Sequence, residues 1–296
     1  MSVANPASRL TWRTFFSGYP LLALGLLALC IPTLYAMATE SWTREEGVHG
    51  PLVLATAIWL VWRNLDEIMA EARPGHPAVT APVLLLGVAV YIFGRAFDFL
   101  MIEVAALLLI LLAIAYAFVG HRVLMKMWFP IIYMGFLIPL PGWLLDSMTQ
   151  PLKLLVSDIT TDLLSWFGYP IVRTGVTLYI AQYQLLVEDA CAGLNSLISL
   201  TAVGLFYIYL LHNASWRYSL ILLAFVVPIA IAANIVRVII LVLITYYFGD
   251  EAAQGYLHDF AGIVTFVSAL LLIFLLDGLL TPLRRRLGGR PHAQTA

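Results

Sequence analysis

The sequence predicts an all-α polytopic membrane protein, on two features of its composition and one of its pattern. Hydrophobic residues make up 62% of the 296 positions and charged residues only 11%, and the mean hydropathy is +0.92. Soluble domains carry about 25% charged residues, so this composition suits lipid as the solvent. The apolar residues gather in runs of about 20, the length of an α-helix that crosses a bilayer.

Eight apolar runs are candidates for membrane-spanning helices. They cover residues 20–38, 48–62, 80–97, 100–119, 127–141, 192–211, 218–247 and 259–280. The second and fifth are short, and the seventh contains Pro228, so we expect it to kink or to extend beyond the membrane. The sequence shows no internal repeat and no polar stretch long enough for a soluble domain. We therefore expect one membrane-embedded domain over 1–296, with a basic cytoplasmic tail at 281–296.

The first run imitates a secretory signal peptide. Arg9 and Arg13 precede it, and Ala36-Met37-Ala38 resembles a cleavage site. The run from Pro20 to Ala38 is longer than the roughly 7 to 15 apolar residues of a signal peptide. We therefore interpret it as an uncleaved first helix.

Basic residues indicate the orientation, because Lys and Arg concentrate in cytoplasmic loops. With eight spans, one side holds eleven basic residues: Arg9, Arg13, Arg63, Arg73, Arg122, Lys126, Arg217, Arg284, Arg285, Arg286 and Arg290. The other side holds four: Arg44, Arg95, Lys153 and Arg173. This asymmetry predicts that both termini are cytoplasmic.

The longest segment between spans, about 141–189, then lies outside the cytoplasm. Apolar residues recur at helical spacing from Leu144 to Phe167, with Asp146, Lys153, Asp158 and Asp162 at other positions, so we expect an amphipathic helix on the membrane surface. The stretches 176–180 and 183–187 favour a small β-hairpin or extended cover. Both lead into the segment 188–193.

This topology selects the residues that share the outer face. Four of the six histidines are cytoplasmic, namely His76, His121, His212 and His292, and Cys30 lies near the middle of the first span. Cys191, His49 and His258 remain. A lone cysteine facing an oxidising compartment is a candidate reactive thiol, although a single Cys is as often a small buried hydrophobe. Cys191 would stand at the positive end of a helix dipole, which favours the thiolate, whereas Glu188 and Asp189 oppose it.

Arg237 is the candidate cation for this thiolate. An arginine inside an apolar run is costly, which indicates a partner or a functional site, with snorkelling to the interface as the alternative. Asn234 lies one turn earlier on nearly the same face. His258 opens the last span and is suited to proton transfer, or is simply a polar interface residue. Asp259 cannot be assumed to orient it, because adjacent helical residues do not face each other.

A transporter is the first alternative, and a noncatalytic assembly factor the second. Arg95, Asp98, Glu103 and Arg237 would form the charged pathway of a transporter, with Cys191 incidental. Structural ion pairs explain the first three at least as well, and the paired inverted halves of many transporters are missing from the sequence. An assembly factor would not require Cys191, Arg237 and His258 to converge.

The blocks around these residues resemble the exosortase/archaeosortase family over about residues 40–280. The matching blocks are Ala190-Cys191-Ala192-Gly193-Leu194-Asn195-Ser196, Ala233-Asn234-Ile235-Val236-Arg237, His258-Asp259 and His49-Gly50-Pro51-Leu52-Val53. Their order is fairly specific in combination. Ala192 departs from the commonest pattern, in which Ser follows the cysteine, and this leaves the exosortase subtype open.

The resemblance implies an enzyme of the bacterial inner membrane with its active site facing the periplasm. Its substrates would be membrane-anchored proteins with a C-terminal sorting signal, which consists of a Pro-Glu-Pro type motif, a transmembrane helix and a basic tail. The enzyme would cleave the signal and transfer the new C-terminus to an unknown acceptor. Cys191 would be the nucleophile, Arg237 the stabiliser of the oxyanion or thiolate, and His258 the proton-transferring group. His49, Asn195 and Asn234 are supporting candidates, and the sequence supports no metal or organic cofactor and no nucleic-acid partner.

Overall fold

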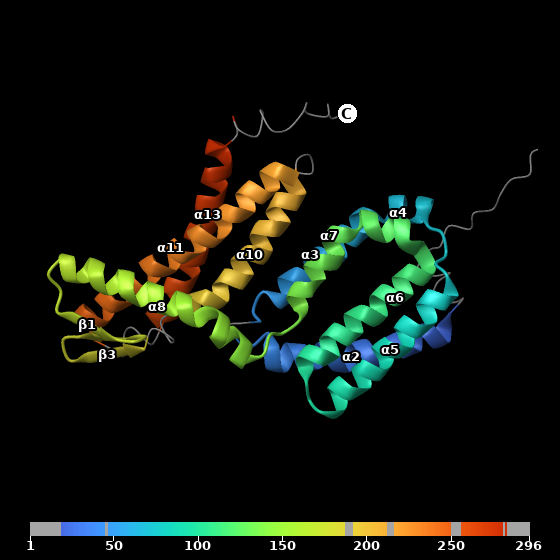
Figure 1. Cartoon of the computed structure of the whole chain (residues 1–296), viewed down its shortest axis with the longest axis horizontal. Coiled ribbons are helices and arrows are strands. Elements are labelled where there is room, and N and C mark those ends of the chain that lie inside the picture. Colours follow the sequence, from blue (N-terminus) through green and yellow to red (C-terminus); the bar gives the residue numbers. More distant parts are fainter. Residues whose placement is uncertain are drawn as a thin grey trace, which may run out of the picture. The chain divides into compact units, whose positions relative to one another are not determined.

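The computed structural model of the chain describes residues 19–44, 47–186, 192–211, 216–249, 256–280 and 282, which are mostly helical (Figure 1). The chain divides into two compact units, Met1–Leu140 and Pro141–Ala296. Each unit has its own hydrophobic contacts and is described by itself.

Unit 1 is built around a helical hairpin. Its helices are α2 (Pro20–Ala36), which continues as the π-helix η1 (Met37–Ser41), then α3 (Gly50–Arg63), α4 (Leu65–Glu71), α5 (Pro77–Ala96), α6 (Leu100–Lys126), α7 (Trp128–Tyr133) and the 3₁₀-helix η2 (Met134–Leu137). Helices α5 and α6 form the hairpin, and α2 packs on α6. Tyr91, Ala106, Leu107 and Ile110 are buried where the hairpin closes.

Helix α6 breaks at Gly120, where the backbone has φ 74° and ψ 176°. The carbonyl oxygens of Ala117 and Val119 lose their helical donors at this break. They accept hydrogen bonds instead from the N–H groups of Gly75 (3.1 Å) and Arg73 (3.2 Å). The break therefore coincides with the end predicted for the fourth apolar run, and the loop before α5 closes it.

Unit 2 combines one long helix, a small sheet and three packed helices. Its elements are α8 (Gly142–Trp166), β1 (Ile171–Thr174), β2 (Thr177–Ile180), β3 (Tyr183–Leu186), α10 (Ala192–Leu211), α11 (Trp216–Phe248) and α13 (Tyr256–Leu279). The strands form an antiparallel sheet in the order β1-β2-β3, with Tyr179 opposite Val172 and Gln184. Val156 of α8, Leu178 and Ile180 of β2, and Val238 of α11 share one buried cluster, so the sheet and α8 both rest on α11.

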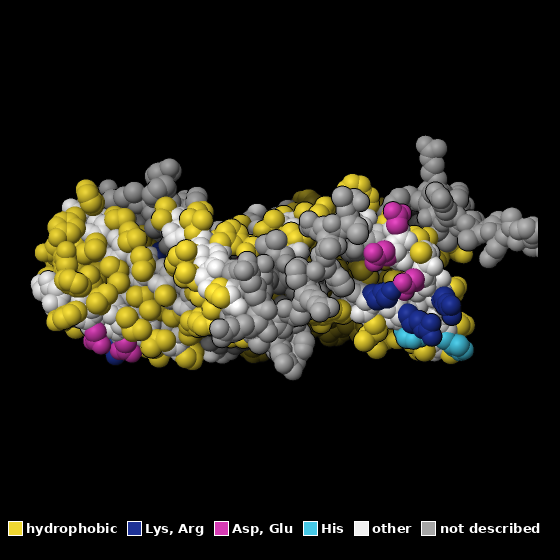
Figure 2. Space-filling view, turned by 90° about the horizontal axis from the view of Figure 1, so that it is seen from above, with side chains coloured by type: hydrophobic (Ala, Val, Ile, Leu, Met, Phe, Trp, Pro, Cys, Tyr) yellow, Lys and Arg dark blue, Asp and Glu magenta, His cyan; other side chains and the backbone are white. Residues whose placement is uncertain are grey.

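The eight predicted apolar runs all coincide with helical segments. Among the residues that the structure describes, four stretches are long and apolar enough to cross a membrane: Pro20–Ser41, Pro77–Ala96, Leu100–Lys126 and Ala224–Phe248. Four further apolar stretches in the described residues are shorter: Gly50–Arg63, Trp128–Leu137, Thr201–Leu210 and Val267–Leu279. Hydrophobic side chains cover much of the described surface in Figure 2, as a lipid-facing protein requires. The fold is therefore that of a helical polytopic membrane protein, and the eight-span topology stays a prediction.

The segment between the fifth and sixth runs matches its prediction in outline. The predicted amphipathic helix is α8, and the predicted hairpin is β2–β3. Strand β1 was not predicted. Helix α11 continues through Pro228 and is 33 residues long, about 50 Å, so it is longer than a bilayer core rather than broken at the proline.

Candidate functional site

Two of the three predicted catalytic residues, Arg237 and His258, belong to α11 and α13, which pack against each other and against α10 (Figure 1). Cys191 lies outside the described residues, directly before Ala192, the first residue of α10. The side chains of Asn195 and His258 also lie outside the described part of the chain. The backbone of His258 belongs to the first turn of α13.

Arg237 and Asn234 are buried on one face of α11. Arg237 is 4% exposed and Asn234 is 1% exposed, and residues three apart in a helix lie on the same side. Ala233 packs in a cluster with Ala269 and Ile273 of α13, and Val238 packs in the cluster formed with α8 and the sheet. The guanidinium is therefore held inside unit 2 and does not snorkel to the surface.

A glycine sets how closely α10 approaches its neighbours. A Cβ on Gly204 would lie 3.2 Å from Val226 Cγ2 of α11 and 3.9 Å from Ile273 Cδ1 of α13. Val226 and Ile273 are themselves buried in one cluster. These three residues form a packing layer, here called the Gly204 layer, at which the three helices meet.

The sheet brings the chain to the beginning of α10. Strand β3 packs on α11, and a Cβ on Gly249 at the end of α11 would lie 3.6 Å from the hydroxyl oxygen of Tyr183. Only five residues separate Leu186, the last residue of β3, from Ala192. The sheet therefore lies against the C-terminal half of α11.

Lys153 is a buried cation, although the sequence predicted it away from the apolar face of its helix. It is 6% exposed, and its Nζ lies 3.1 Å from Asp146 Oδ1. Ser157 and Thr160 on the same helix are fully buried, whereas Leu155 and Ile159 are exposed. The buried face of α8 is therefore mixed, because Lys153, Ser157 and Thr160 lie there with Val156 and Leu164, and part of the apolar residues point outward. The spacing of Lys153, Ser157 and Thr160 was the available signal.

His49 belongs to unit 1, at the N-cap of α3. Its side chain is 8% exposed, and Nε2 lies 3.0 Å from the carbonyl oxygen of Phe136. A carbonyl can only accept, so Nε2 carries the proton and Nδ1 presents a lone pair. Within the described residues this buried Nδ1 has no hydrogen-bond partner. His49 therefore ties α3 to η2, and its buried Nδ1 is an acceptor without a partner among the described residues.

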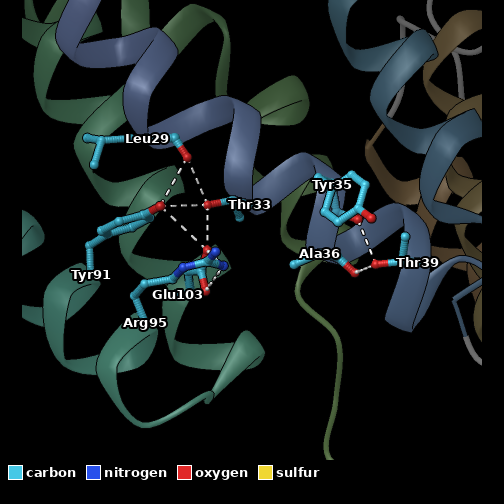
Figure 3. Close-up of polar contacts among 8 residues, drawn as sticks. All are labelled: Leu29, Thr33, Tyr35, Ala36, Thr39, Tyr91, Arg95 and Glu103. Atoms are coloured by element: carbon cyan, nitrogen blue, oxygen red, sulfur yellow. Dashed lines mark hydrogen bonds and ion pairs between the residues drawn. The ribbon is translucent and has the colours of Figure 1, made fainter.

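Two of the charged residues assigned to the transporter alternative, Arg95 and Glu103, belong to one network of polar contacts in unit 1 (Figure 3). Glu103 of α6 is 2% exposed, accepts a hydrogen bond of 2.7 Å from Thr33 Oγ1 of α2, and pairs with Arg95 of α5 at 3.3 Å. The Tyr91 hydroxyl lies 2.9 Å from Thr33 Oγ1 and donates to the Leu29 carbonyl at 3.0 Å. These contacts join three helices, as expected for structural ion pairing.

Two other acidic residues lie apart from this network. Asp98 is exposed in the turn between α5 and α6, with a positive φ of 55°, and within the described residues it forms no ion pair. Asp277 of α13 accepts a hydrogen bond of 2.8 Å from the Tyr207 hydroxyl. The described residues contain no group of three or more His, Cys, Asp or Glu side chains placed to hold a metal ion.

Comparison with known proteins identifies one relationship. No curated protein and no solved structure matches the chain. The family model of the transmembrane exosortases matches residues 42–275, which include α3 and most of the helices of both units. This match covers well over half of the sequence, and the chain therefore belongs to the transmembrane exosortase family.

Proposed function

We propose that this protein is a membrane-embedded cysteine peptidase and transpeptidase that cleaves C-terminal sorting signals. Family membership indicates a membrane protein that processes such signals on membrane-associated protein substrates. The proposal adds the chemistry, the form of the signal and the location. The signal is a Pro-Glu-Pro type motif followed by a transmembrane helix and a basic tail. The enzyme lies in the inner membrane, and its active site faces the periplasm.

Cys191 acts as the nucleophile in this proposal. Its thiolate attacks the scissile carbonyl, and Arg237 stabilises first the thiolate and then the oxyanion. His258 donates a proton to the leaving amine as the C–N bond breaks, which leaves a thioester on Cys191. His258 then accepts a proton from the incoming amine or water, which displaces the sulfur. No cofactor is needed for these steps.

The observation that carries the proposal is the buried cation at the depth where α10 and α13 begin. Figure 1 shows α11 running against the direction of α10 and α13. Along the helices, Ala192 is 12 residues from the Gly204 layer, Arg237 is 11 and His258 is 15. At 1.5 Å per residue these separations are about 18, 17 and 23 Å.

These similar depths support convergence of the three catalytic groups. The Cα atom of Cys191 is about 3.8 Å from that of Ala192, so the thiol starts from nearly the same depth. The remaining offset of His258, about 6 Å, is within the combined reach of an arginine and a histidine side chain. A buried guanidinium in a protein interior of low dielectric is well suited to stabilise an anion there.

Three further residues are proposed as supporting groups. Asn234, one turn from Arg237, is placed to orient the guanidinium or to donate to the substrate. Asn195 follows the cysteine by one turn of α10 and would present its amide beside the thioester. His49 would contact the substrate through Nδ1, the acceptor that has no partner among the described residues.

The test is to co-express the protein with a tagged membrane protein that carries a sorting signal of this form. We expect Cys191→Ala and Cys191→Ser to abolish the mobility shift that marks signal removal. Cys30→Ser is the matched control, because Cys30 is the only other cysteine and lies in α2. It should process the substrate at the wild-type rate. Normal processing by a well-folded Cys191→Ala protein would show that Cys191 is not the nucleophile.

A further inference from the structure

Unit 1 contains a basic pocket that the proposed chemistry does not use. The pocket has a volume of about 310 Å³, and its walls include Arg73, His76, Tyr116, His121 and Arg122. It lies at the end of the α5–α6 hairpin that is remote from the turn at 97–99. Figure 2 shows this end of unit 1 as a group of Lys, Arg and His side chains beside acidic ones.

The backbone holds the two sides of this pocket together. The N–H groups of Arg73 and Gly75 donate to carbonyl oxygens at the end of the first part of α6, and the N–H of His76 donates to the Tyr116 hydroxyl at 3.3 Å. Gly120 turns the chain between Val119 and His121 with a positive φ. The loop that carries Arg73 and His76 is therefore fixed opposite the segment that carries His121 and Arg122.

The described residues leave two arginines of the pocket without ion pairs. Within the described ranges, neither Arg73 nor Arg122 forms an ion pair. Glu71 is the acidic residue of the pocket wall, and it is paired with Lys126. Two exposed guanidinium groups thus line a concave site whose one acidic wall residue among those described is already paired with Lys126. An anion that fits between them would gain charge-assisted hydrogen bonds.

The pocket also adjoins a surface suited to hydrocarbon. Helix α5 begins at Pro77, directly after His76, and the apolar part of α6 ends at Val119, so both candidate spans begin or end at the pocket. Val79, Leu85 and Leu86 of α5 are exposed along the hairpin. A molecule with an anionic head and apolar chains would contact both surfaces at once.

We propose that the basic pocket binds a phosphate group, and that its source is the headgroup of an anionic phospholipid. Arginine presents a planar fork of donors that matches two phosphate oxygens, and basic pockets between membrane-spanning helices are suited to such headgroups. Arg73 and Arg122 grip the phosphate, and His76 and His121 contribute polar contacts. The adjoining apolar face of α5 favours a lipid over free phosphate.

The experiment uses the full-length protein in nanodiscs of phosphatidylcholine with a minority of phosphatidylglycerol. Native mass spectrometry counts the phosphatidylglycerol molecules that stay bound and gives their apparent affinity. We expect Arg73→Gln and Arg122→Gln each to lower that affinity about 5-fold, and the double variant about 10- to 30-fold. Glutamine keeps the backbone donor of Arg73 that closes α6, so the loop should remain in place.

Arg63→Gln is the matched control, because Arg63 is a surface cation at the end of α3 and lies over the Trp59 ring, outside the pocket. The affinity of Arg63→Gln for phosphatidylglycerol should stay within about 2-fold of the wild-type value. This change is smaller than the one expected when a cation that contacts the phosphate is removed. An equal loss in Arg63→Gln and in the pocket variants would overturn the proposal, because general attraction to the anionic surface would then explain binding. A second arm adds inorganic phosphate to nanodiscs of phosphatidylcholine alone. The melting temperature is measured with phosphate and, separately, with phosphatidylglycerol. If phosphate stabilises the protein as much as phosphatidylglycerol does, the lipid is not the source of the phosphate group.

Discussion

Arg237 is the residue on which the proposed chemistry depends most directly among those described. A buried arginine costs desolvation energy, which a structural role repays only through good partners. The catalytic role proposed for it would account for that cost, because the proposed acyl transfer forms an anion that a guanidinium stabilises. The distinction between a structural and a catalytic arginine can be measured.

Arg237→Lys retains the charge but loses the planar fork of donors. If the guanidinium stabilises the oxyanion, we expect kcat to fall about 100-fold while KM changes little, because the lost contact forms only in the transition state. Purified protein and a synthetic signal peptide in detergent would give both constants. Arg173→Lys is the control, since Arg173 is a half-exposed residue of β1 paired with Asp158. An increase in KM with an unchanged kcat would argue instead for a role in substrate binding.

Glu103 shows a different use of a buried charge, because its partners are all supplied by helices of unit 1. Glu103→Gln keeps the shape of the side chain but removes the charge that faces Arg95 and weakens the acceptor of Thr33. We expect a loss of about 1–3 kcal/mol in unfolding free energy, measured by denaturant titration in mixed micelles. Asp98→Asn, an exposed change in the neighbouring turn, should cost less than about 0.5 kcal/mol. Processing of the substrate by folded Glu103→Gln protein should be normal, whereas its loss would favour a charged pathway.

At the scale of elements, the break in α6 depends on one glycine. Gly120 has a positive φ, and a Cβ there would overlap the carbonyl oxygen of Arg73. We expect Gly120→Ala to lower the unfolding free energy by about 1–3 kcal/mol, because the strained backbone or the displaced loop must absorb the new atom. Gly135→Ala provides the control, since nothing lies within 4 Å of the Cβ position there. Equal melting temperatures for the two variants would show that the break in α6 accepts a side chain at position 120 without loss of stability.

The sequence predicted helices better than it predicted which faces of them are buried. Runs of about 20 apolar residues are a strong helical signal, and the eight runs coincide with helical segments. Strand β1 was missed because four residues with Arg173 among them carry no clear alternation. On α8, Lys153 was expected away from the apolar face, but part of the apolar face is exposed and Lys153 is buried. In lipid, hydrophobicity does not separate a protein-facing side chain from a lipid-facing one.

The sequence likewise predicted some features of the candidate site and not others. The types and order of Cys191, Arg237 and His258 could be read from the sequence. The burial of Arg237 argues against the snorkelling alternative, and its catalytic role stays a prediction. The depth of each residue could not be predicted, because it depends on how α10, α11 and α13 meet at the Gly204 layer. That contact is fixed by side-chain packing between segments far apart in the chain.

At the scale of the whole molecule, the proposed function requires the sheet and the beginning of α10 to face the periplasm, and the predicted eight-span topology places the basic pocket in the cytoplasm. The charge asymmetry supports this orientation, since Arg73, Arg122 and Lys126 gather around one end of the α5–α6 hairpin. Single cysteines in a background of Cys30→Ala and Cys191→Ala can report each side. Gln182 is exposed in the turn between β2 and β3, and Glu67 is exposed on α4.

We expect a membrane-impermeant maleimide to label Gln182→Cys in cells whose outer membrane alone has been opened. Glu67→Cys should be labelled only after the inner membrane is also permeabilised, because the predicted topology places α4 on the cytoplasmic side. The cysteine-free background measures non-specific labelling. Labelling of Glu67→Cys in cells with an intact inner membrane would reverse the orientation. Cys191 would then face a compartment without exported substrates, and the peptidase proposal would fail together with the topology.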